Sequence, residues 1–270
     1  MFELVPNLAE GRSAETIAAA IATVEKTGAR VLNWSSDEIH HRSVLTIVGD
    51  RTQALEAAVA LAGVALERID LRNHTGVHPR IGALDVLPFV PLRGASLDDA
   101  ADLAHRAGAR IWERYRVPSF YYGAAARTPD RRPLPAIRSN LDWLPDEGDV
   151  VRHPSAGAIA IGARAILIAF NIELGTAELP IARAIAREVR ERNGGLRSLR
   201  ALGLPRGDDR VQVSLNVTDY AATPLYRVVE LVRELAAARG VELLGCELIG
   251  CVPIAAVESA AAYYLGVSKL

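Results

Sequence analysis

The sequence predicts an α/β (α+β) protein built from two ferredoxin-like subdomains, each with the element order βαββαβ. Short apolar runs of strand length alternate with alanine-rich amphipathic segments of helix length, and the same order occurs in both halves. The length of 270 residues suits one large domain or two of roughly 100 to 160 residues each. We expect subdomains at 1–163 and 164–270, each an antiparallel or mixed sheet with helices on one face, and a cleft between them.

The first half follows the order strand, helix, strand, strand, helix, strand. Ser13 and Asp50 are typical helix N-caps, because their side chains accept hydrogen bonds from the first amides of a helix. We expect the first helix to end before Gly28 and the second at about Glu67. The strands are expected at 2–5, 30–34, 43–49 and 84–90.

The second half repeats this order. Thr176 is expected to cap a helix that ends at about Arg192. Thr223, with Pro224 at the first helical position, is expected to open a helix that stops at Gly240. The strands are expected at 165–171, 199–204, 211–217 and 241–246.

Additional segments decorate the two units. We expect a helix at 96–114 followed by a strand at 117–122, and a C-terminal helix from about Pro253. The stretch 127–154 is rich in proline, arginine and aspartate, so we interpret it as a connecting loop that covers a site and not as core. The glycines of 157–162 are more typical of a close strand approach than of a phosphate-binding loop.

Composition restricts the classes of partner. A net charge of −1 provides no overall field for nucleic acid or an acidic membrane, so anionic ligands would be held by locally placed arginines. The N-terminus lacks a basic segment followed by an apolar one, and no uncharged stretch reaches the roughly 18 residues that span a bilayer. We therefore expect a cytoplasmic protein. Cys246 and Cys251 are expected to pack in the core, and no histidine follows His153 to complete a zinc site with them.

The segment 74–86 is the first candidate for chemistry. It holds His74, His78 and Arg80 with two glycines before a very apolar run. A histidine moves protons near neutral pH, an arginine holds a carboxylate in a fixed fork, and glycine lets the backbone approach a ligand. The plainer alternative is a loop that ends at a buried strand after Pro79.

The remaining histidines divide into two groups. His105 lies inside a predicted helix, where we expect it on a solvated face. The others lie in predicted loops or at strand ends. A metal ion surrounded by some of these side chains is an alternative, but Gly76 and Pro79 disfavour the helix that two-histidine metal spacings use, so no metal is expected. The side chains in question are His40, His41, His74, His78 and Asp85.

A set of segments spread along the chain carries a family resemblance. They are 5–11, 42–49, 69–74, 78–91, 122–123, 162–163, 169–171 and 212–216. Together they resemble the formiminotransferase family, the glutamate formimidoyltransferases of histidine breakdown. The similarity covers nearly the whole chain, and the segment around His78 is its most specific part. We expect the cyclodeaminase half of bifunctional members to be absent after Leu270.

The resemblance implies a transferase of one-carbon metabolism, with tetrahydrofolate as co-substrate and formimidoylglutamate as the other substrate. His78 matches the proposed catalytic histidine of the family, and a single imidazole can take a proton from the attacking amine and give one to the departing amine. Substrate and folate binding is expected from residues that alternatively form surface ion pairs or cap strand ends. These are Asn7, Glu10, Arg42, His74, Arg80, Tyr122, Asn171 and Asn216.

Three positions depart from the family pattern. Asn33 stands where members commonly carry aspartate, His41 where they carry asparagine, and Ala124 where they carry glutamate. Loss of acidic groups near a cationic formimidoyl group would reduce or redirect activity. The alternatives are therefore a transferase of another one-carbon group, such as formyl, and a non-catalytic folate-binding protein. A homodimer is a further expectation, because sheet edges often pair.

Overall fold

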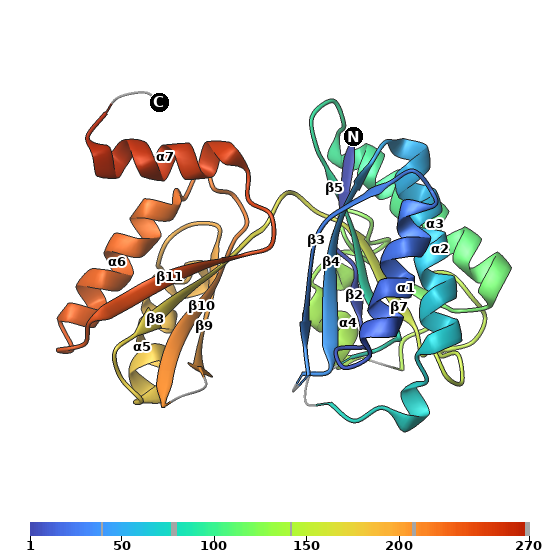
Figure 1. Ribbon diagram of the computed structural model, residues 1–270, viewed down its shortest axis with the longest axis horizontal. Coiled ribbons are helices and arrows are strands. Elements are labelled where there is room, and N and C mark those ends of the chain that lie inside the picture. Colours follow the sequence, from blue (N-terminus) through green and yellow to red (C-terminus); the bar gives the residue numbers. More distant parts are fainter. Residues whose placement is uncertain (39, 77–79, 141, 207–208, 268–270) are drawn as a thin grey trace. The chain divides into compact units, whose positions relative to one another are not determined.

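The computed structural model describes residues 1–38, 40–76, 80–140, 142–206 and 209–267. The chain divides into two compact units, residues Met1–Ala165 and Ile166–Leu270 (Figure 1). Each unit has its own hydrophobic core.

The sheet of the first unit is mixed. Its order is β3, β4, then β1 with β2, then β5, β7 and β6. β1 and β2 pair in succession with the same neighbours, β4 and β5, so they are two parts of one strand path interrupted around Pro6. β5, β7 and β6 are parallel to one another, and the other pairings are antiparallel. The strands are β1 (Phe2–Leu4), β2 (Asn7–Leu8), β3 (Arg30–Asp37), β4 (Arg42–Gly49), β5 (Leu84–Pro91), β6 (Ser119–Gly123) and β7 (Ile159–Ala163).

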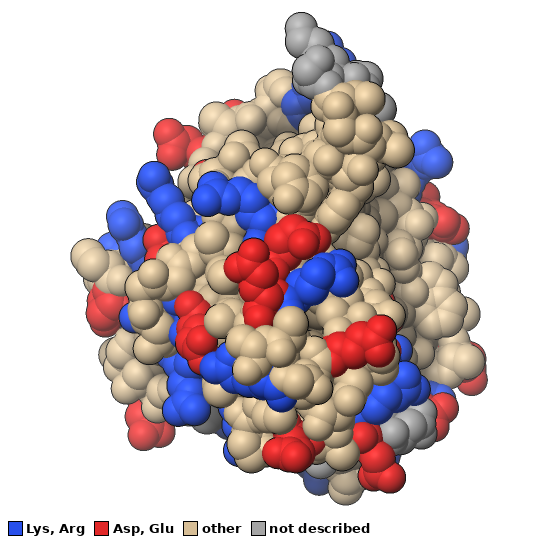
Figure 2. Space-filling model, turned by 90° about the vertical axis from the view of Figure 1, so that its left-hand side faces the viewer, with Lys and Arg blue, Asp and Glu red and all other residues tan. Residues whose placement is uncertain are grey.

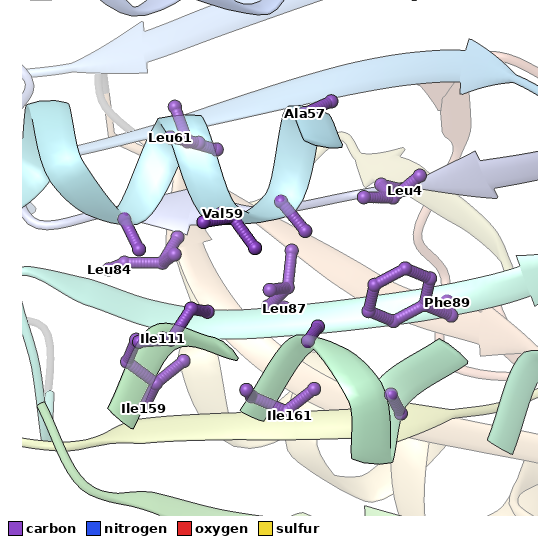
Figure 3. Packing of buried hydrophobic residues seen from close by; sticks show 14 of the residues in the cluster. Leu4, Ala57, Val59, Leu61, Leu84, Leu87, Phe89, Ile111, Ile159 and Ile161 are labelled. Atoms are coloured by element: carbon purple, nitrogen blue, oxygen red, sulfur yellow. The ribbon is translucent and has the colours of Figure 1, made fainter. Parts of the chain in front are cut away.

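Three helices pack on one face of this sheet: α1 (Ala14–Glu25), α2 (Arg51–Arg68) and α3 (Leu97–Tyr115). Ser13 and Asp50 cap α1 and α2 as the sequence predicts, and Asp50 forms a full capping box with Gln53. Apolar residues of α2 and α3 interdigitate with those of β5 and β7, as Figure 3 shows for Val59, Leu87 and Ile161. This core fixes the strands that carry the site.

The opposite face is covered over β5, β6 and β7 by α4 (Leu134–Ser139). Ile137 of α4 is 1% exposed and packs in a cluster with Val86, Phe120 and Tyr122. The prediction that 127–154 is loop without core contacts is therefore wrong for α4. A short 3-10 helix at Pro129–Arg131 precedes it, and another at Leu71–Asn73 precedes His74.

The second unit has a four-stranded antiparallel sheet in the order β11, β8, β10, β9. Numbered within each unit, the βαββαβ strands of both sheets follow the order 4-1-3-2, which confirms the predicted fold. Buried residues of α5, α6 and the sheet form one core, to which α7 adds Ala256. The elements are β8 (Ile168–Leu174), α5 (Leu179–Val189), the 3-10 helix Glu191–Asn193, β9 (Leu199–Arg206), β10 (Arg210–Val217), α6 (Leu225–Ala237), β11 (Leu243–Ile249) and α7 (Ile254–Leu265).

Two helix starts in this unit differ from the prediction. α5 begins after Glu178 and not after Thr176, whose hydroxyl instead accepts a hydrogen bond from the Glu178 amide at 3.1 Å. The Thr223 hydroxyl donates to the Arg197 carbonyl at 2.5 Å, so α6 begins after Pro224 without a side-chain cap. Both threonines stabilise the loop before the helix.

The cysteine prediction is wrong, because Cys246 and Cys251 are both exposed. Cys246 lies on β11, an edge strand whose last four residues are all exposed. On the face drawn in Figure 2, basic and acidic side chains of the described residues are interspersed. No helix in the described part of the chain is long and apolar enough to cross a membrane.

Candidate functional site

The segment between the first 3-10 helix and β5 is fastened at both ends. The Leu71 amide donates to the Ser155 carbonyl at 2.8 Å, and the Ala158 amide donates to the Ile81 carbonyl at 2.9 Å. His78, the predicted catalytic residue, lies outside the described residues. The described part of the site consists of residues on either side of it.

His74 is held as a neutral ring. Its Nε2 lies 2.9 Å from the Ala9 carbonyl and donates to it, so Nδ1 is the acceptor for the Arg80 guanidinium. Burial lowers the pKa of His74, and the charge of Arg80 and the neighbouring His41 lower it further. Both ring nitrogens of His74 are thus engaged within the protein.

His41 stacks on His74, with ring centroids 4.1 Å apart and an interplanar angle of 29°. Its Nδ1 accepts a hydrogen bond from the Gly11 amide at 3.0 Å. Burial lowers the pKa of His41, and Arg12 and Arg80 add to this, while Glu10 opposes it. Since Nδ1 is an acceptor here, the Glu10 carboxylate oxygen at 3.5 Å does not accept a hydrogen bond from that nitrogen, and it pairs with His41 only when the ring is protonated.

The backbone explains the unusual residue at this position. His41 has a φ of 50°, in the left-handed region that asparagine, aspartate and histidine enter more readily than other side chains. The resemblance gives asparagine as the usual family residue. Histidine satisfies the same backbone requirement and adds a titratable ring.

Glu10 fastens the loop before α1. Its Oε1 accepts hydrogen bonds from the amides of Arg12 and Ser13, at 2.7 and 2.9 Å. The Arg12 side chain makes two further hydrogen bonds. Its Nε donates to the Glu38 carbonyl at 3.0 Å, and its Nη1 donates to the Thr75 hydroxyl at 3.3 Å. The β2–α1 loop, the β3–β4 turn and the His74 segment are joined in this way.

Arg80 completes this group of side chains. Its Nη2 donates to the His40 carbonyl at 3.1 Å, while Nη1 contacts His74. A Cβ on Gly76 would lie 2.8 Å from the Cβ of His41 and 2.9 Å from the His40 carbonyl oxygen, so the packing requires glycine at this position. Glu10, His41, His74 and Arg80 form what we call the histidine–arginine group.

Arg42 and Tyr122 lie in a second group, around Asp85. The Asp85 carboxylate is 2% exposed and binds Arg138 of α4 at 2.5 Å. Burial lowers the pKa of Arg42, against the charge of Asp85, and burial raises the pKa of Tyr122 to about 12. Tyr122 therefore keeps its phenolic proton at neutral pH and remains a hydrogen-bond donor.

The three predicted asparagines lie outside these groups. The Nδ2 of Asn7 on β2 donates to the Val5 carbonyl at 3.1 Å. Asn171 and Asn216 belong to the second unit, where Ser214 pairs with Asn171 and Asn216 with Ala169. They lie on the sheet face opposite the buried one, and Asn171 approaches Glu247 at 3.4 Å.

The other residues singled out from the sequence differ in their exposure. His105 is not on a solvated face, because it is half-buried, donates from Nε2 to the Ala125 carbonyl at 2.8 Å and contacts the Tyr121 ring. Asn33 and Ala124 are exposed. Within the described ranges, no three histidine, cysteine or acidic side chains are grouped to hold a metal ion.

Arg138 of the second group was missed from the sequence, and Asp85 was considered only as a possible metal ligand. Asp85 is the one charged residue in the apolar run 81–90, which is a signal that it has a buried partner. That partner, Arg138, is 53 residues away in the stretch expected to be loop, so the sequence alone gave no reason to connect them.

Two βαββαβ units, with imidazole rings beside guanidinium groups in the first unit, define an α/β protein with cationic side chains suited to binding carboxylates. The family model of the formiminotransferase domain, N-terminal subdomain, matches residues 1–164, and that of the formiminotransferase domain matches 169–270. The chain belongs to the formiminotransferase family.

Full-length relatives agree with this assignment. The chain is 40% identical to a glutamate formimidoyltransferase of Thermoplasma acidophilum, over 98% of this chain and 92% of that protein. It is 37% identical to the glutamate formimidoyltransferase of Streptococcus pyogenes, over 98% of this chain and 93% of that one. The formimidoyltransferase-cyclodeaminase of Rattus norvegicus is 37% identical over 100% of this chain and 53% of its own length.

Proposed function

We propose that this protein transfers a formimidoyl group between N-formimidoylglutamate and tetrahydrofolate, within histidine degradation. The observation that carries the proposal is the similarity along 98% of the chain to two proteins named glutamate formimidoyltransferase. Tetrahydrofolate is the co-substrate that the family resemblance implies, and we expect no metal to take part.

The transfer needs one proton carrier. The attacking nitrogen of tetrahydrofolate loses a proton when its bond to the formimidoyl carbon forms, and the departing glutamate nitrogen gains one when its bond to that carbon breaks. Both nitrogens of His74, and Nδ1 of His41, are engaged in hydrogen bonds within the protein. This supports His78 as the general acid and base, because it is the remaining histidine of the motif.

The arginines of the two groups fit the anionic parts of the substrates. Arg80 and Arg42 are the proposed partners of carboxylates on the glutamate moieties, because a guanidinium binds a carboxylate through two parallel hydrogen bonds. Tyr122 keeps its proton and is a proposed hydrogen-bond donor. Asn7, Glu10, His74, Asn171 and Asn216 remain proposed contacts of the substrate amide and the folate ring.

A second candidate is the transfer of a formyl group. The observation in its favour is the loss of two family carboxylates, at Asn33 and Ala124, since a neutral formyl group needs no acidic neighbour. Turnover of tetrahydrofolate with N-formimidoylglutamate and with N-formylglutamate, measured side by side on the purified protein, separates the two candidates. Activity with the formyl donor alone would contradict the first proposal.

The setting is proposed with the function. We place the protein in the cytoplasm, acting on small molecules without a nucleic-acid or membrane partner. A homodimer remains a hypothesis, which sedimentation equilibrium on the purified protein tests directly.

A further inference from the structure

Asp85 is a buried carboxylate in the first unit that the proposed mechanism does not use. It is 2% exposed, so its charge must be compensated by hydrogen bonds and a partner charge. Its two oxygens have different partners. Oδ1 accepts a hydrogen bond from the Ile81 amide at 2.7 Å, and Oδ2 accepts one from Nη2 of Arg138 at 2.5 Å.

An irregularity in the sheet accompanies this arrangement. Asn7 of β2 pairs with Val86 and Leu8 pairs with Leu84, so Asp85 has no pairing partner on β2. A β-bulge of this kind inserts one residue and redirects its side chain. Because Asp85 meets Arg138 of α4, the bulge directs the carboxylate to the α4 side of the sheet.

The same carboxylate acts on the proposed substrate-binding arginines. Arg42 and Arg80 are both partly desolvated, and the charge of Asp85 stabilises the protonated form of each guanidinium. Asp85 thus serves as a shared counter-charge for three arginines, and one of its oxygens is committed to the backbone at Ile81.

Ile81 follows His78 by three residues, and its own carbonyl accepts from Ala158. We propose that Asp85 and Arg138 are positioning residues, which clamp the chain at Ile81 to α4 and so hold the C-terminal end of the segment that carries His78. This inference rests on the proposed function, because it assigns its effect to His78. At the other end, Leu71 and His74 hold the segment through Ser155 and Ala9.

The chain offers a matched control, the pair Asp146 and Arg131. The side chain of Asp146 is 5% exposed. Like Asp85, it accepts a hydrogen bond from one backbone amide, that of Tyr121 at 2.8 Å, and it forms an ion pair with one arginine, Arg131, at 2.8 Å. Arg131→Ala therefore removes a buried ion pair of the same kind but leaves the hydrogen bond of Ile81 in place.

The experiment compares Asp85→Asn, Arg138→Ala and Arg138→Lys with Arg131→Ala, all at a temperature where urea titration shows each variant to be folded. Hydrogen exchange at the Ile81 amide is measured in each protein, together with kcat and KM for N-formimidoylglutamate and tetrahydrofolate. Because misplacing a catalytic group by about 1 Å costs on the order of 100-fold in rate, we expect a 10- to 100-fold loss of kcat in Asp85→Asn and Arg138→Ala.

The remaining readouts separate positioning from general destabilisation. We expect exchange at Ile81 to rise in Asp85→Asn and Arg138→Ala, and Arg138→Lys to recover part of kcat, while Arg131→Ala keeps the wild-type kcat. Both KM values are expected to stay near those of the wild type in Arg138→Ala, which keeps the charge of Asp85 beside Arg42 and Arg80. An unchanged kcat, an equal loss in Arg131→Ala, or a loss without faster exchange at Ile81 would overturn the proposal. If the wild type itself shows no turnover of N-formimidoylglutamate and tetrahydrofolate, the proposed function fails. Hydrogen exchange at the Ile81 amide then decides by itself whether Asp85 and Arg138 hold the chain at Ile81, and exchange as slow in Asp85→Asn and Arg138→Ala as in the wild type would overturn this.

Discussion

The two stacked histidines of the site each accept a hydrogen bond at a ring nitrogen, which the protonated ring cannot do. Gly11 donates to His41, and Arg80 donates to His74. Burial and neighbouring guanidinium groups lower the pKa of both rings. At the residue scale, the site therefore favours neutral imidazole, with Arg80 as its neighbouring cation.

This arrangement predicts the pH dependence of stability. A histidine whose folded-state pKa lies below its unfolded value of about 6.5 binds more protons when unfolded, so stability is full above that pH and falls as the pH drops through the window below it. We expect the urea midpoint to decrease from pH 7 to pH 5. In His41→Asn, which suits the left-handed backbone, part of this decrease should disappear. If the urea midpoint of His41→Asn decreases between pH 7 and pH 5 as much as that of the wild type, the lowered pKa of His41 is contradicted.

Arg80 predicts a change in substrate affinity. In Arg80→Lys, an ammonium replaces the planar guanidinium that already contacts His74 and the His40 carbonyl. The additional N–H donors that are proposed to bind a carboxylate in a fixed geometry are then lost. We expect KM for N-formimidoylglutamate to rise about tenfold or more, the equivalent of about 1.4 kcal/mol. Arg72→Lys is the control, because Arg72 is exposed and pairs with Asp70. Equal KM values in the two variants would contradict the role of Arg80.

The site was partly predictable at this scale. His74 and Arg80 were selected from a motif and Glu10 on the resemblance, and the structure brings these three residues together with His41. Asn7, Asn171 and Asn216 were selected on the resemblance, and their described contacts do not link them to that group. Arg138 was missed because its contact with Asp85 depends on tertiary packing across 53 residues.

At the element scale, α4 shows where sequence patterns fail. Its six residues are too few to form a stable helix alone, and prolines and arginines surround it, so the pattern indicates a loop. Packing determines its structure, because Ile137 is buried against β5 and β6 and Arg138 binds Asp85. Helices with long amphipathic runs and good caps, such as α2, were predicted to within a few residues.

Removing the buried side chain of α4 tests this packing. We expect Ile137→Ala to lower the free energy of unfolding by about 2–4 kcal/mol, because it leaves a cavity in the cluster with Phe120 and Tyr122. Urea unfolding followed by tryptophan fluorescence is suitable, since Trp143 packs against the same cluster. Leu144 is 72% exposed, so Leu144→Ala should change the free energy of unfolding by less than about 0.5 kcal/mol. Similar losses in both would contradict the packing of α4.

A glycine sets the distance between α5 and β9 in the second unit. A Cβ on Gly203 would lie 2.3 Å from the Arg183 amide nitrogen, a backbone atom that cannot rotate away. We expect Gly203→Ala to destabilise the protein by about 1–3 kcal/mol, measured by circular dichroism because the three tryptophans lie in the first unit. Gly245→Ala, on β11 of the same sheet, meets no atom within 4 Å and should be near neutral. The opposite ranking would contradict this packing.

At the scale of the whole molecule, the chain repeats one βαββαβ plan, and each copy builds its own sheet and core. This plan was predictable from the sequence because strand and helix lengths recur in order in both halves. The first unit adds α3, β6, α4 and β7 to the plan. Its site lies where the β2–α1 loop, the β3–β4 turn and the segment before β5 meet.

The central claim is that His78 carries the proton in formimidoyl transfer. The most direct test is turnover of tetrahydrofolate with N-formimidoylglutamate by the wild type and by His78→Ala, with His105→Gln as a control that keeps a donor for the Ala125 carbonyl. Loss of general acid and base catalysis is expected to lower kcat by about 100- to 10,000-fold in His78→Ala and to leave His105→Gln at the wild-type rate. Equal turnover by His78→Ala and the wild type would contradict the account.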